Sequence, residues 1–318
     1  MSYQPPVLTR VRSVFLFVVS LLAAAAGLSA QHYSDWESPE NLGGIVNSSF
    51  NDQHPAISPD GLSLYFVSDR PGGTGGIDLW VTQRDSSEDP WQPPAPLSSI
   101  VNSTGSENAP AFSASGHLLF FGSDRPGGCG DRDLWVSFRR NKRDDFGWQA
   151  PVHLGCVVNS IGLDDGPTYV EDDDQGVTLY FTSLNRPGGF GDFDIWASTM
   201  NGDGTFNPPV NTFELNTNVR DTRTAIRRGG GELLFTSNRS GGIGGLDLWV
   251  ATRDEESPFW SVPLNLGSVV NSTANDGAPA LSRDGRALFF YSNRPGGVGA
   301  NDLYLSRRNK IAPGQLKE

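Results

Sequence analysis

A glycine-rich segment occurs five times in the chain and constrains the fold more than any other feature. Its first copy, residues 70–80, reads RPGGTGGIDLW, and in every copy an aspartate follows the arginine eight residues later. The five pairs are Arg70 and Asp78, Arg125 and Asp133, Arg186 and Asp194, Arg239 and Asp247, and Arg294 and Asp302. Five copies with fixed internal spacing identify a repeat protein in which each copy is one structural unit.

Each repeat contains four short strand-like segments, and no segment has the pattern of a long amphipathic helix. An aromatic residue with a proline three residues later opens the first segment, as in Trp36 and Pro39. The third segment carries Leu-x-Phe-x-Ser in every copy, which has the period of two expected of a strand with one buried face. The sequence therefore predicts an all-β, five-bladed β-propeller whose blades are four-stranded antiparallel sheets.

The order of the segments also predicts how the ring closes. The chain opens with the strand near residues 36–42 and ends with the strand that begins at Asp302, so the last blade lacks its outermost strand. Pairing the two removes an unsatisfied sheet edge. We expect the N-terminal strand to complete the blade built from residues 279–307.

The first thirty residues differ from the rest of the chain. Arg10 and Arg12 precede an apolar run over residues 14–28, and small residues lead to a cleavage site after Ala30. This is the layout of a secretory signal peptide, and the run is short for the alternative, a membrane anchor of about 20 apolar residues. We predict a signal peptide at 1–30, the propeller at 31–308 and a disordered tail at 309–318, in a protein exported to the periplasm or the extracellular space.

The charge balance argues against one class of partner. The chain has 24 basic and 36 acidic residues, and removal of the leader takes away two arginines, which leaves a net charge of −14. Nucleic-acid affinity rests on cationic contacts to phosphate, so we expect no nucleic-acid partner. We also expect no membrane insertion of the mature chain, which we predict to be a monomer with a protein or glycan of the cell envelope as its partner.

The repeats resemble the WD40-like PD40 family, known from the propeller of TolB. The resemblance rests on residues 55–80, PAISPDGLSLYFVSDRPGG…DLW, and on their four copies, and so covers nearly all of the mature chain. It implies a propeller and little about function, because propellers host many unrelated functions. TolB itself does not fit, because its family has an extra N-terminal domain and six blades.

The glycine loops have a structural interpretation. Asp78 and its equivalents are expected to accept hydrogen bonds from the N–H groups of their own loop and from the arginine eight residues back. A phosphate cradle is one alternative, but no helix follows the glycines. Calcium is another, although each loop offers few carboxylates for an ion that prefers six or more oxygens. We predict no cofactor, with Ca²⁺ as the alternative, and assign no metal site.

A second set of acids introduces the innermost strands, each five residues after an asparagine that has a Ser or Thr neighbour. They are Asp52, Glu107, Asp164, Asp221 and Asp276. We expect them to ring the central channel, where they either cap their own loops or bind a cation or a ligand. His54 and Arg223 lie just inside this ring and break the repeat, so they join these acids as binding candidates.

The chain has two cysteines, Cys129 and Cys156. One lies in the second glycine loop and the other in the link to the third blade. Because an exported protein can be oxidised, we predict a disulfide between these neighbouring loops.

Two functions from different classes fit these patterns. Every strong signal repeats five-fold, whereas an enzyme site needs differing residues from different blades, so the sequence favours a non-catalytic binding scaffold over an enzyme. The alternative is a glycan-active enzyme, since other five-bladed propellers are glycoside hydrolases. It would use Asp52, Asp164 and Asp221 as carboxylates at the channel mouth.

Overall fold

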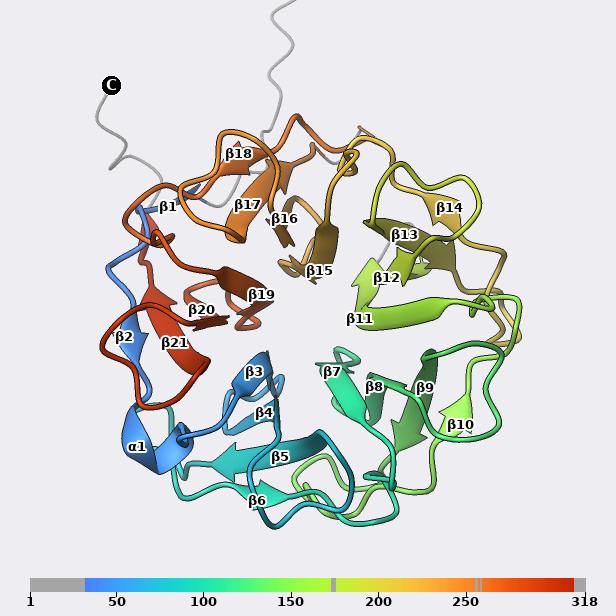
Figure 1. Ribbon diagram of the computed structural model, residues 1–318, viewed down its shortest axis with the longest axis horizontal. Helices are drawn as coiled ribbons and strands as arrows, with labels where there is room; N and C mark the ends of the chain where they lie inside the picture. Colours follow the sequence, from blue (N-terminus) through green and yellow to red (C-terminus); the bar gives the residue numbers. More distant parts are fainter. Residues whose placement is uncertain (1–31, 173–175, 255–256, 258, 312–318) are drawn as a thin grey trace, which may run out of the picture. The chain divides into compact units, whose positions relative to one another are not determined.

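The computed structural model describes residues 32–172, 176–254, 257 and 259–311, and residues 33–310 form one compact unit, a five-bladed β-propeller (Figure 1). In four blades the strands follow the chain from the channel outward. These blades are β3 (Asp52–Ile57), β4 (Ser63–Ser68), β5 (Asp78–Gln83) and β6 (Ala95–Pro96); β7 (Glu107–Phe112), β8 (Leu118–Ser123), β9 (Asp133–Phe138) and β10 (Val152–His153); β11 (Leu163–Asp172), β12 (Gly176–Leu184), β13 (Phe193–Thr199) and β14 (Val210–Asn211); and β15 (Asp221–Ile226), β16 (Glu232–Ser237), β17 (Asp247–Thr252) and β18 (Leu264–Asn265). All neighbouring strands within a blade are antiparallel, which confirms the predicted fold.

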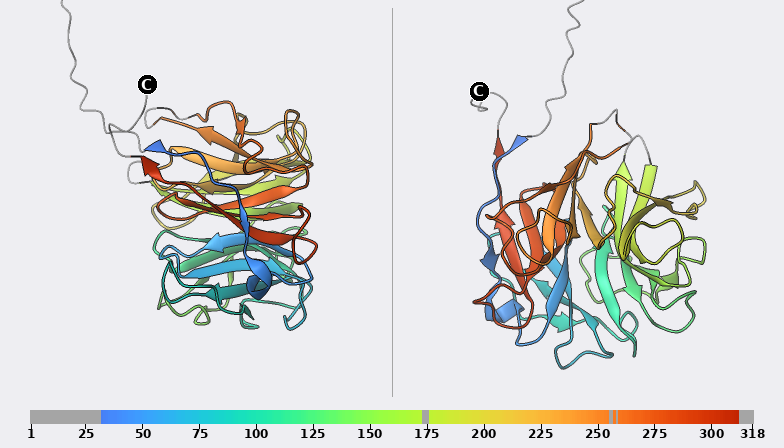
Figure 2. Two further views of the ribbon diagram at one scale, coloured as in Figure 1. Left: turned by 90° about the vertical axis from the view of Figure 1, so that its left-hand side faces the viewer. Right: turned by 45° about the horizontal axis from the view of Figure 1, so that its top comes forward.

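The fifth blade is built from both ends of the described chain. It contains β19 (Asp276–Leu281), β20 (Ala287–Ser292) and β21 (Asp302–Arg307), and its outermost strand is β2 (Glu40–Asn41). Residues Glu40 and Asn41 pair with Leu305 and Tyr304, and Figure 2 shows β2 beside β21. The short helix α1 (Gly43–Val46) then leads into the first blade. The predicted closure of the ring is confirmed.

One more strand pair lies near the ends of the described chain. β1 (His32–Tyr33) pairs with β22 (Lys310–Ile311), which falls within the segment predicted to be a tail. The predicted signal peptide at 1–30 and the rest of the predicted tail lie outside the described residues. Among the residues that are described, no helix is long and apolar enough to cross a membrane.

The hydrophobic core lies between neighbouring blades. Leu64 and Phe66 of the Leu-x-Phe-x-Ser strand are fully buried, and they pack with Trp80 of their own blade and with Leu303 and Leu305 of the fifth blade. Burying a side chain of this size stabilises a fold by about 1.5–3 kcal/mol. Because each cluster takes residues from two blades, a blade that loses its neighbour also loses half of its core.

The two cysteines form the predicted disulfide. Cys129 and Cys156 are 27 residues apart in sequence, and their Cα atoms are 5.8 Å apart. The bond joins the glycine loop of the second blade to the link that leads to the third blade.

Replacing both cysteines by serine is expected to lower the free energy of unfolding by about 3 kcal/mol. A cross-link over 27 residues restricts the unfolded chain, and its removal restores that loop-closure entropy. Urea unfolding of the two proteins measures the difference. An unchanged urea midpoint in the double variant would show that the bond contributes nothing to stability.

Candidate functional site

The repeated arginine holds together the start of each blade. The Cζ atom of Arg70 lies 5.1 Å from the ring centre of Phe66 and 5.2 Å from that of Trp80, and its Nη2 donates to Asp52. The prediction that this arginine binds Asp78 is therefore wrong. The other copies pair Arg125 with Glu107, Arg186 with Asp164, Arg239 with Asp221 and Arg294 with Asp276. The conserved spacing of arginine, acid and two rings within each repeat is explained by this one packing unit, which we call the arginine staple.

The five acids that precede the innermost strands are all bound within these arginine staples. Each is completely buried, and besides its arginine it accepts hydrogen bonds from the nearby Ser or Thr, as Asp52 does from the N–H and Oγ of Ser48 at 2.6 and 2.9 Å. The structural interpretation is confirmed, because Asp52, Glu107, Asp164, Asp221 and Asp276 each accept a hydrogen bond from a backbone N–H of their own loop. Their complete burial leaves no carboxylate of this set exposed to the channel. A ligand in the channel does not reach them, and this includes the three acids of the alternative catalytic set.

The staple of the third blade is looser than the others. Two residues, Leu184 and Asn185, separate Ser183 from Arg186, whereas the other copies have one residue there. The distance from Arg186 Nη2 to Asp164 Oδ1 is 3.4 Å, and the buried Arg186 Nε and Ser183 Oγ have no hydrogen-bond partner within the described chain. In the first blade the equivalent atoms, Arg70 Nε and Ser68 Oγ, bond at 3.0 Å.

The aspartates of the glycine loops bind their own loops, as predicted. Asp78 accepts hydrogen bonds from the N–H groups of Thr74 at 2.8 Å and Gly75 at 3.1 Å, and the other four copies repeat this pattern. A Cβ atom on Gly73 would lie 1.9 Å from the carboxylate of Asp78, so the tight loop requires glycine there. These carboxylates serve the loop.

One cluster has the residue types of a metal site. In the described part of the chain, Cys129, Asp133 and His153 are the one group of three or more such residues with close ligand atoms. The disulfide to Cys156 removes the thiolate that a metal ion needs. The cluster therefore does not fit a metal ion.

Each innermost strand has a β-bulge at the same repeat position, next to the channel. The bulge residue has left-handed backbone in all five blades, with φ between 48° and 61°. These residues are His54, Ala109, Gly166, Arg223 and Ala278. Left-handed backbone is uncommon outside glycine, and a bulge re-aims side chains. It turns His54 and Arg223, the two predicted candidates, into the channel.

The channel contains two cavities separated by a constriction. The first, of about 240 Å³, lies at the end where the innermost strands begin, and we call it the entry cavity. The second, of about 190 Å³, lies at the end where these strands turn into the next strand, and we call it the exit pocket. The bulge residues and the residues that follow them, four prolines and Thr224, line the constriction, which holds about 30 Å³.

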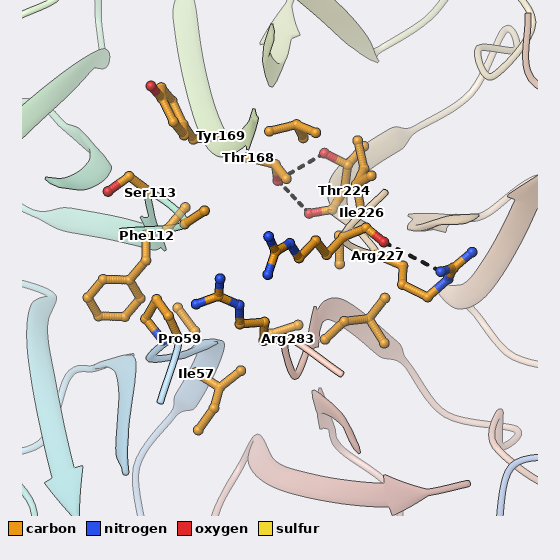
Figure 3. Close-up of a pocket in the computed structure, with 18 of the residues that line it drawn as sticks. Ile57, Pro59, Phe112, Ser113, Thr168, Tyr169, Thr224, Ile226, Arg227 and Arg283 are labelled. Carbon is orange, nitrogen blue, oxygen red and sulfur yellow. Dashed lines mark hydrogen bonds between the residues drawn. The ribbon is translucent and has the colours of Figure 1, made fainter. Parts of the chain in front are cut away.

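The exit pocket is lined by both apolar and polar side chains (Figure 3). Ile57, Phe112 and Ile226 contribute to its wall, and the side chain of Arg283 reaches across its mouth. The side chains of Arg228 and Arg283 are exposed at this mouth and have no ion pair within the described residues. Hydroxyl groups of Thr168 and Thr224 also line this pocket and bond to one another at 3.0 Å.

The polar network of the entry cavity centres on Asp165. Its Oδ2 accepts hydrogen bonds from Asn108 Nδ2 at 2.8 Å, Arg132 Nη1 at 2.9 Å and Arg223 Nη2 at 2.9 Å, and its Oδ1 accepts one from the N–H of Gly166 at 2.7 Å. Burial alone would raise the pKa of Asp165, but Arg223 and Arg132 hold this pKa well below its usual range. Asp165 is therefore ionised at any physiological pH.

The ionised Asp165 fixes the protonation state of His54 through Asn108. A carboxylate only accepts, so Asn108 turns its NH₂ group to Asp165 and its Oδ1 to His54 Nδ1. Nδ1 therefore carries the proton. Burial and the charge of Arg223 lower the pKa of His54 to about 3, so the ring is neutral. Its Nε2 is then an acceptor, and no described residue donates a hydrogen bond to it.

The low pKa of His54 predicts a pH-dependent loss of stability. Between pH 6.5 and 3 the unfolded chain binds a proton at this residue and the folded chain does not, so stability falls as the pH falls through this window. Arg223, Arg132, Asp165 and Tyr291 face the ring from other blades and act together with it.

Asparagine at position 54 adopts left-handed backbone readily and removes the titration. The free energy of unfolding of each protein is compared at pH 7 and pH 4. Its decrease over this range should be about 2–3 kcal/mol smaller for His54→Asn than for the parent, allowing for the part of the ring that solvent reaches. Urea unfolding at several pH values measures this difference. Parallel pH profiles for the two proteins would contradict the assignment.

Tyr291 completes the entry cavity. Its ring stands edge-on to His54 with centroids 5.8 Å apart, and burial raises the pKa of its hydroxyl, so it stays protonated. Two glycines make room for this arrangement. A Cβ atom would lie 2.9 Å from the Tyr291 ring on Gly277 and 2.4 Å from Asp165 on Gly122.

Sequence reasoning found His54 and Arg223 but missed their partners. The missed residues are Asn108, Arg132, Asp165, Arg220 and Tyr291. Each occupies a repeat position at which the five copies differ; Tyr291, for example, stands where the other copies have Val67, Gly122, Thr182 and Thr236. A comparison of the five copies position by position holds the signal that finds them.

Several solved structures that align with this chain are glycoside hydrolases. An α-L-arabinofuranosidase from Lactobacillus brevis aligns with a TM-score of 0.58 at 13% identity, over 84% of this chain and 92% of that one. The catalytic domain of a family-62 α-L-arabinofuranosidase from Coprinopsis cinerea aligns at 0.57 and 15%, over 88% and 99%. A thermostable family-43 glycoside hydrolase aligns at 0.55 and 11%, over 86% and 93%. At these identities the similarity shows the fold.

Two sequence-based interpretations are corrected by this comparison. No family model matches the chain, and no curated protein matches it. Because the structural neighbours are glycoside hydrolases, the assignment to the PD40 repeats of TolB is wrong. The same neighbours contradict the non-catalytic scaffold and favour the glycan-active alternative.

Proposed function

We propose that this protein is an exported glycan-active enzyme that binds one sugar residue in the entry cavity and hydrolyses its glycosidic bond. The observation that carries the proposal is a group of five residues that come from four blades and line one cavity, at repeat positions where the five copies differ. They are His54, Asp165, Arg220, Arg223 and Tyr291. Propellers with a similar fold are glycoside hydrolases. The disulfide supports export, because such bonds persist in oxidising compartments.

The size and chemistry of the entry cavity suit a sugar. Its volume of about 240 Å³ is below the ~300–1,000 Å³ of pockets for drug-sized ligands, which suits a ligand of about one ring. His54 Nε2 offers an acceptor, and Arg223 and the Tyr291 hydroxyl offer donors. Phe193 adds an apolar surface. A sugar presents hydroxyl groups that both donate and accept, together with apolar C–H faces.

The network assigns separate roles to three groups. Within the described ranges Asp165 is the one acid that lines the cavity, and its oxygens are occupied, so it orients Asn108 and Arg223. The pKa of His54, about 3, is close to that of an ordinary carboxylate, so its Nε2 is a base of the strength that glycosidases use. Tyr291 has a protonated hydroxyl that can donate to a departing oxygen.

Hydrolysis then proceeds with balanced proton transfers. Water attacks the anomeric carbon and gives its proton to His54 Nε2, while the bond from that carbon to the leaving oxygen breaks. The leaving oxygen takes the proton of the Tyr291 hydroxyl. Solvent then returns the proton from His54 to Tyr291, which restores both groups.

A cleavage assay on isolated protein tests this function. The substrates are aryl glycosides of pentoses, hexoses and uronic acids together with plant and bacterial polysaccharides, and the readouts are aryl release and new reducing ends. His54→Asn and Tyr291→Phe are each expected to lower kcat by about 10²–10⁴-fold, the usual contribution of general acid–base catalysis. KM should change less.

Two matched variants serve as controls. His117 bonds the carbonyl of Arg139, away from the channel, and Tyr169 lines the exit pocket. His117→Asn and Tyr169→Phe are expected to keep the parent activity. A parent protein that neither cleaves nor binds any of these glycans would overturn the proposal.

A further inference from the structure

The entry cavity carries more positive than negative charge. Arg220 and Arg223 line the cavity, and Arg132 pairs with Asp165, which also lines it and binds Arg223. Arg220 pairs with Asp192. Since His54 is neutral, two carboxylates face three guanidinium groups, and one positive charge remains. The chain as a whole has a net charge of −12, so this local excess runs against its composition.

Part of this excess charge is buried and lacks an acceptor. Within the described residues, Arg223 Nη1 and Arg132 Nε are shielded from solvent and have no hydrogen-bond partner. Buried N–H groups without an acceptor are rare in folded proteins, and a guanidinium group is a donor that matches a carboxylate in two parallel bonds. Arg223 uses Nη2 for Asp165, so Nη1 is the buried atom of this guanidinium that lacks an acceptor among the described residues.

The shape of the site directs Arg223 to this role. Its backbone has left-handed geometry at the bulge, with φ at 56°, and its guanidinium lies across Gly166. A Cβ atom on Gly166 would stand 2.7 Å from Nη1, so only glycine at this bulge leaves Nη1 in its place. Asp165, Thr182 and the bulge thus hold Arg223 before any ligand arrives, which lowers the entropy lost on binding.

We propose that the sugar residue bound in the entry cavity is a uronic acid, whose carboxylate binds Arg223 beside Arg220. This inference rests on the proposed function and specifies its substrate class. A carboxylate carries one negative charge and therefore matches the single excess positive charge, whereas a phosphomonoester carries about 1.5–2 negative charges at pH 7. Neighbouring hydroxyls of the same ring are left for His54 Nε2 and Tyr291.

Matched sugar pairs test the substrate class on the unmodified protein. Calorimetric titrations compare D-galacturonate with D-galactose and with galacturonate methyl ester, and D-glucuronate with D-glucose. We expect each uronate to bind about 10–100-fold more tightly than its neutral partners, the range of a hydrogen bond to a charged group. Only the uronate affinity should fall with added salt.

Arginine variants test the position of the carboxylate. Arg223→Gln should reduce the uronate affinity by about 10–100-fold and the affinity for the neutral sugar by a clearly smaller factor. Arg220→Gln changes a half-exposed group, with 42% of its side chain accessible, and should weaken uronate binding several-fold. Arg228→Gln and Arg283→Gln, at the exit pocket, are matched controls and should have no effect.

The outcomes separate this inference from the proposed function. Equal or tighter binding of the neutral sugars would overturn the proposal that the substrate is a uronic acid, but not the proposal that the protein is a glycan-active enzyme. Preferential binding of a sulfated or phosphorylated sugar would overturn the proposal that the acidic group of the bound sugar is a carboxylate. Loss of uronate binding in Arg228→Gln or Arg283→Gln, with none in Arg220→Gln, moves the site to the exit pocket and overturns the assignment to Arg223. Binding of no sugar overturns both proposals.

Discussion

Replacing Asp221 by alanine is expected to lower the free energy of unfolding by about 3–5 kcal/mol, the usual cost of removing one partner of a buried ion pair. Asp221 is completely buried and accepts hydrogen bonds from the N–H of Thr217 at 2.6 Å, from Thr217 Oγ1 at 2.7 Å and from Ser237 Oγ at 2.6 Å. Its loss also leaves Arg239 without its carboxylate between two aromatic rings.

Urea unfolding measures this loss, and two variants sharpen it. Glu40→Gln removes an exposed ion pair with Arg307 and should change stability by no more than about 1 kcal/mol. The double variant Asp221→Ala with Arg239→Met should lose less than the sum of the single losses, because no charge is left buried alone. A single-variant loss below about 1 kcal/mol would show that the staple is not a stabilising unit.

A chain that begins at Gly43 is expected to lose about 4 kcal/mol and to associate in solution. This truncation removes β2 and the partly buried side chains of Trp36 and Leu42, which pack against the cores on either side of the fifth blade. It also exposes the edge of β21. In the complete chain the N–H of Leu42 donates a hydrogen bond to the carbonyl oxygen of Leu303 on this edge, at 3.0 Å. Open sheet edges pair with other chains.

Light scattering after gel filtration detects this association, and urea unfolding gives the stability. A chain that begins at Asp35 is the matched control, because it loses β1 and keeps β2. It should remain monomeric and keep most of the stability. A Gly43 truncation that stays monomeric, with an unchanged urea midpoint, would contradict the role of β2 in closing the ring.

The fold could be predicted because the repeated motif shows directly how many structural units the chain contains and how long each one is. Five copies of one motif fixed the number of blades, and the count of strands placed the first beside the last, as Glu40 and Asn41 show. The self-binding of Asp78 followed from the needs of a glycine loop. The partner of Arg70 did not follow, because Ser68 pairs with Asp78 and the register carries Arg70 past that aspartate toward Asp52.

The candidate site was predictable only in part, because the bulges are not visible in the sequence. A bulge shifts the alternation of a strand by one residue and exchanges the side chains on its two faces. The register shift between Gln53 and Ala56 therefore turns His54 toward the channel, although Asp52, two residues earlier on the same strand, is buried. Asp165 comes one residue after Asp164. From its position on the strand, Asp164 was predicted to line the channel, but Asp165 is the residue that does so.

The looser staple of the third blade has a consequence for motion. Local opening of a native protein starts where the fewest bonds must break, and such segments often lie next to binding sites. Arg186 keeps a weak bond to Asp164 at 3.4 Å, and Ser183 is left without its usual donor. Backbone amides of β11 should therefore exchange with deuterium sooner than those of the other innermost strands, so that Asp165 sits on the most easily released segment of an otherwise rigid ring.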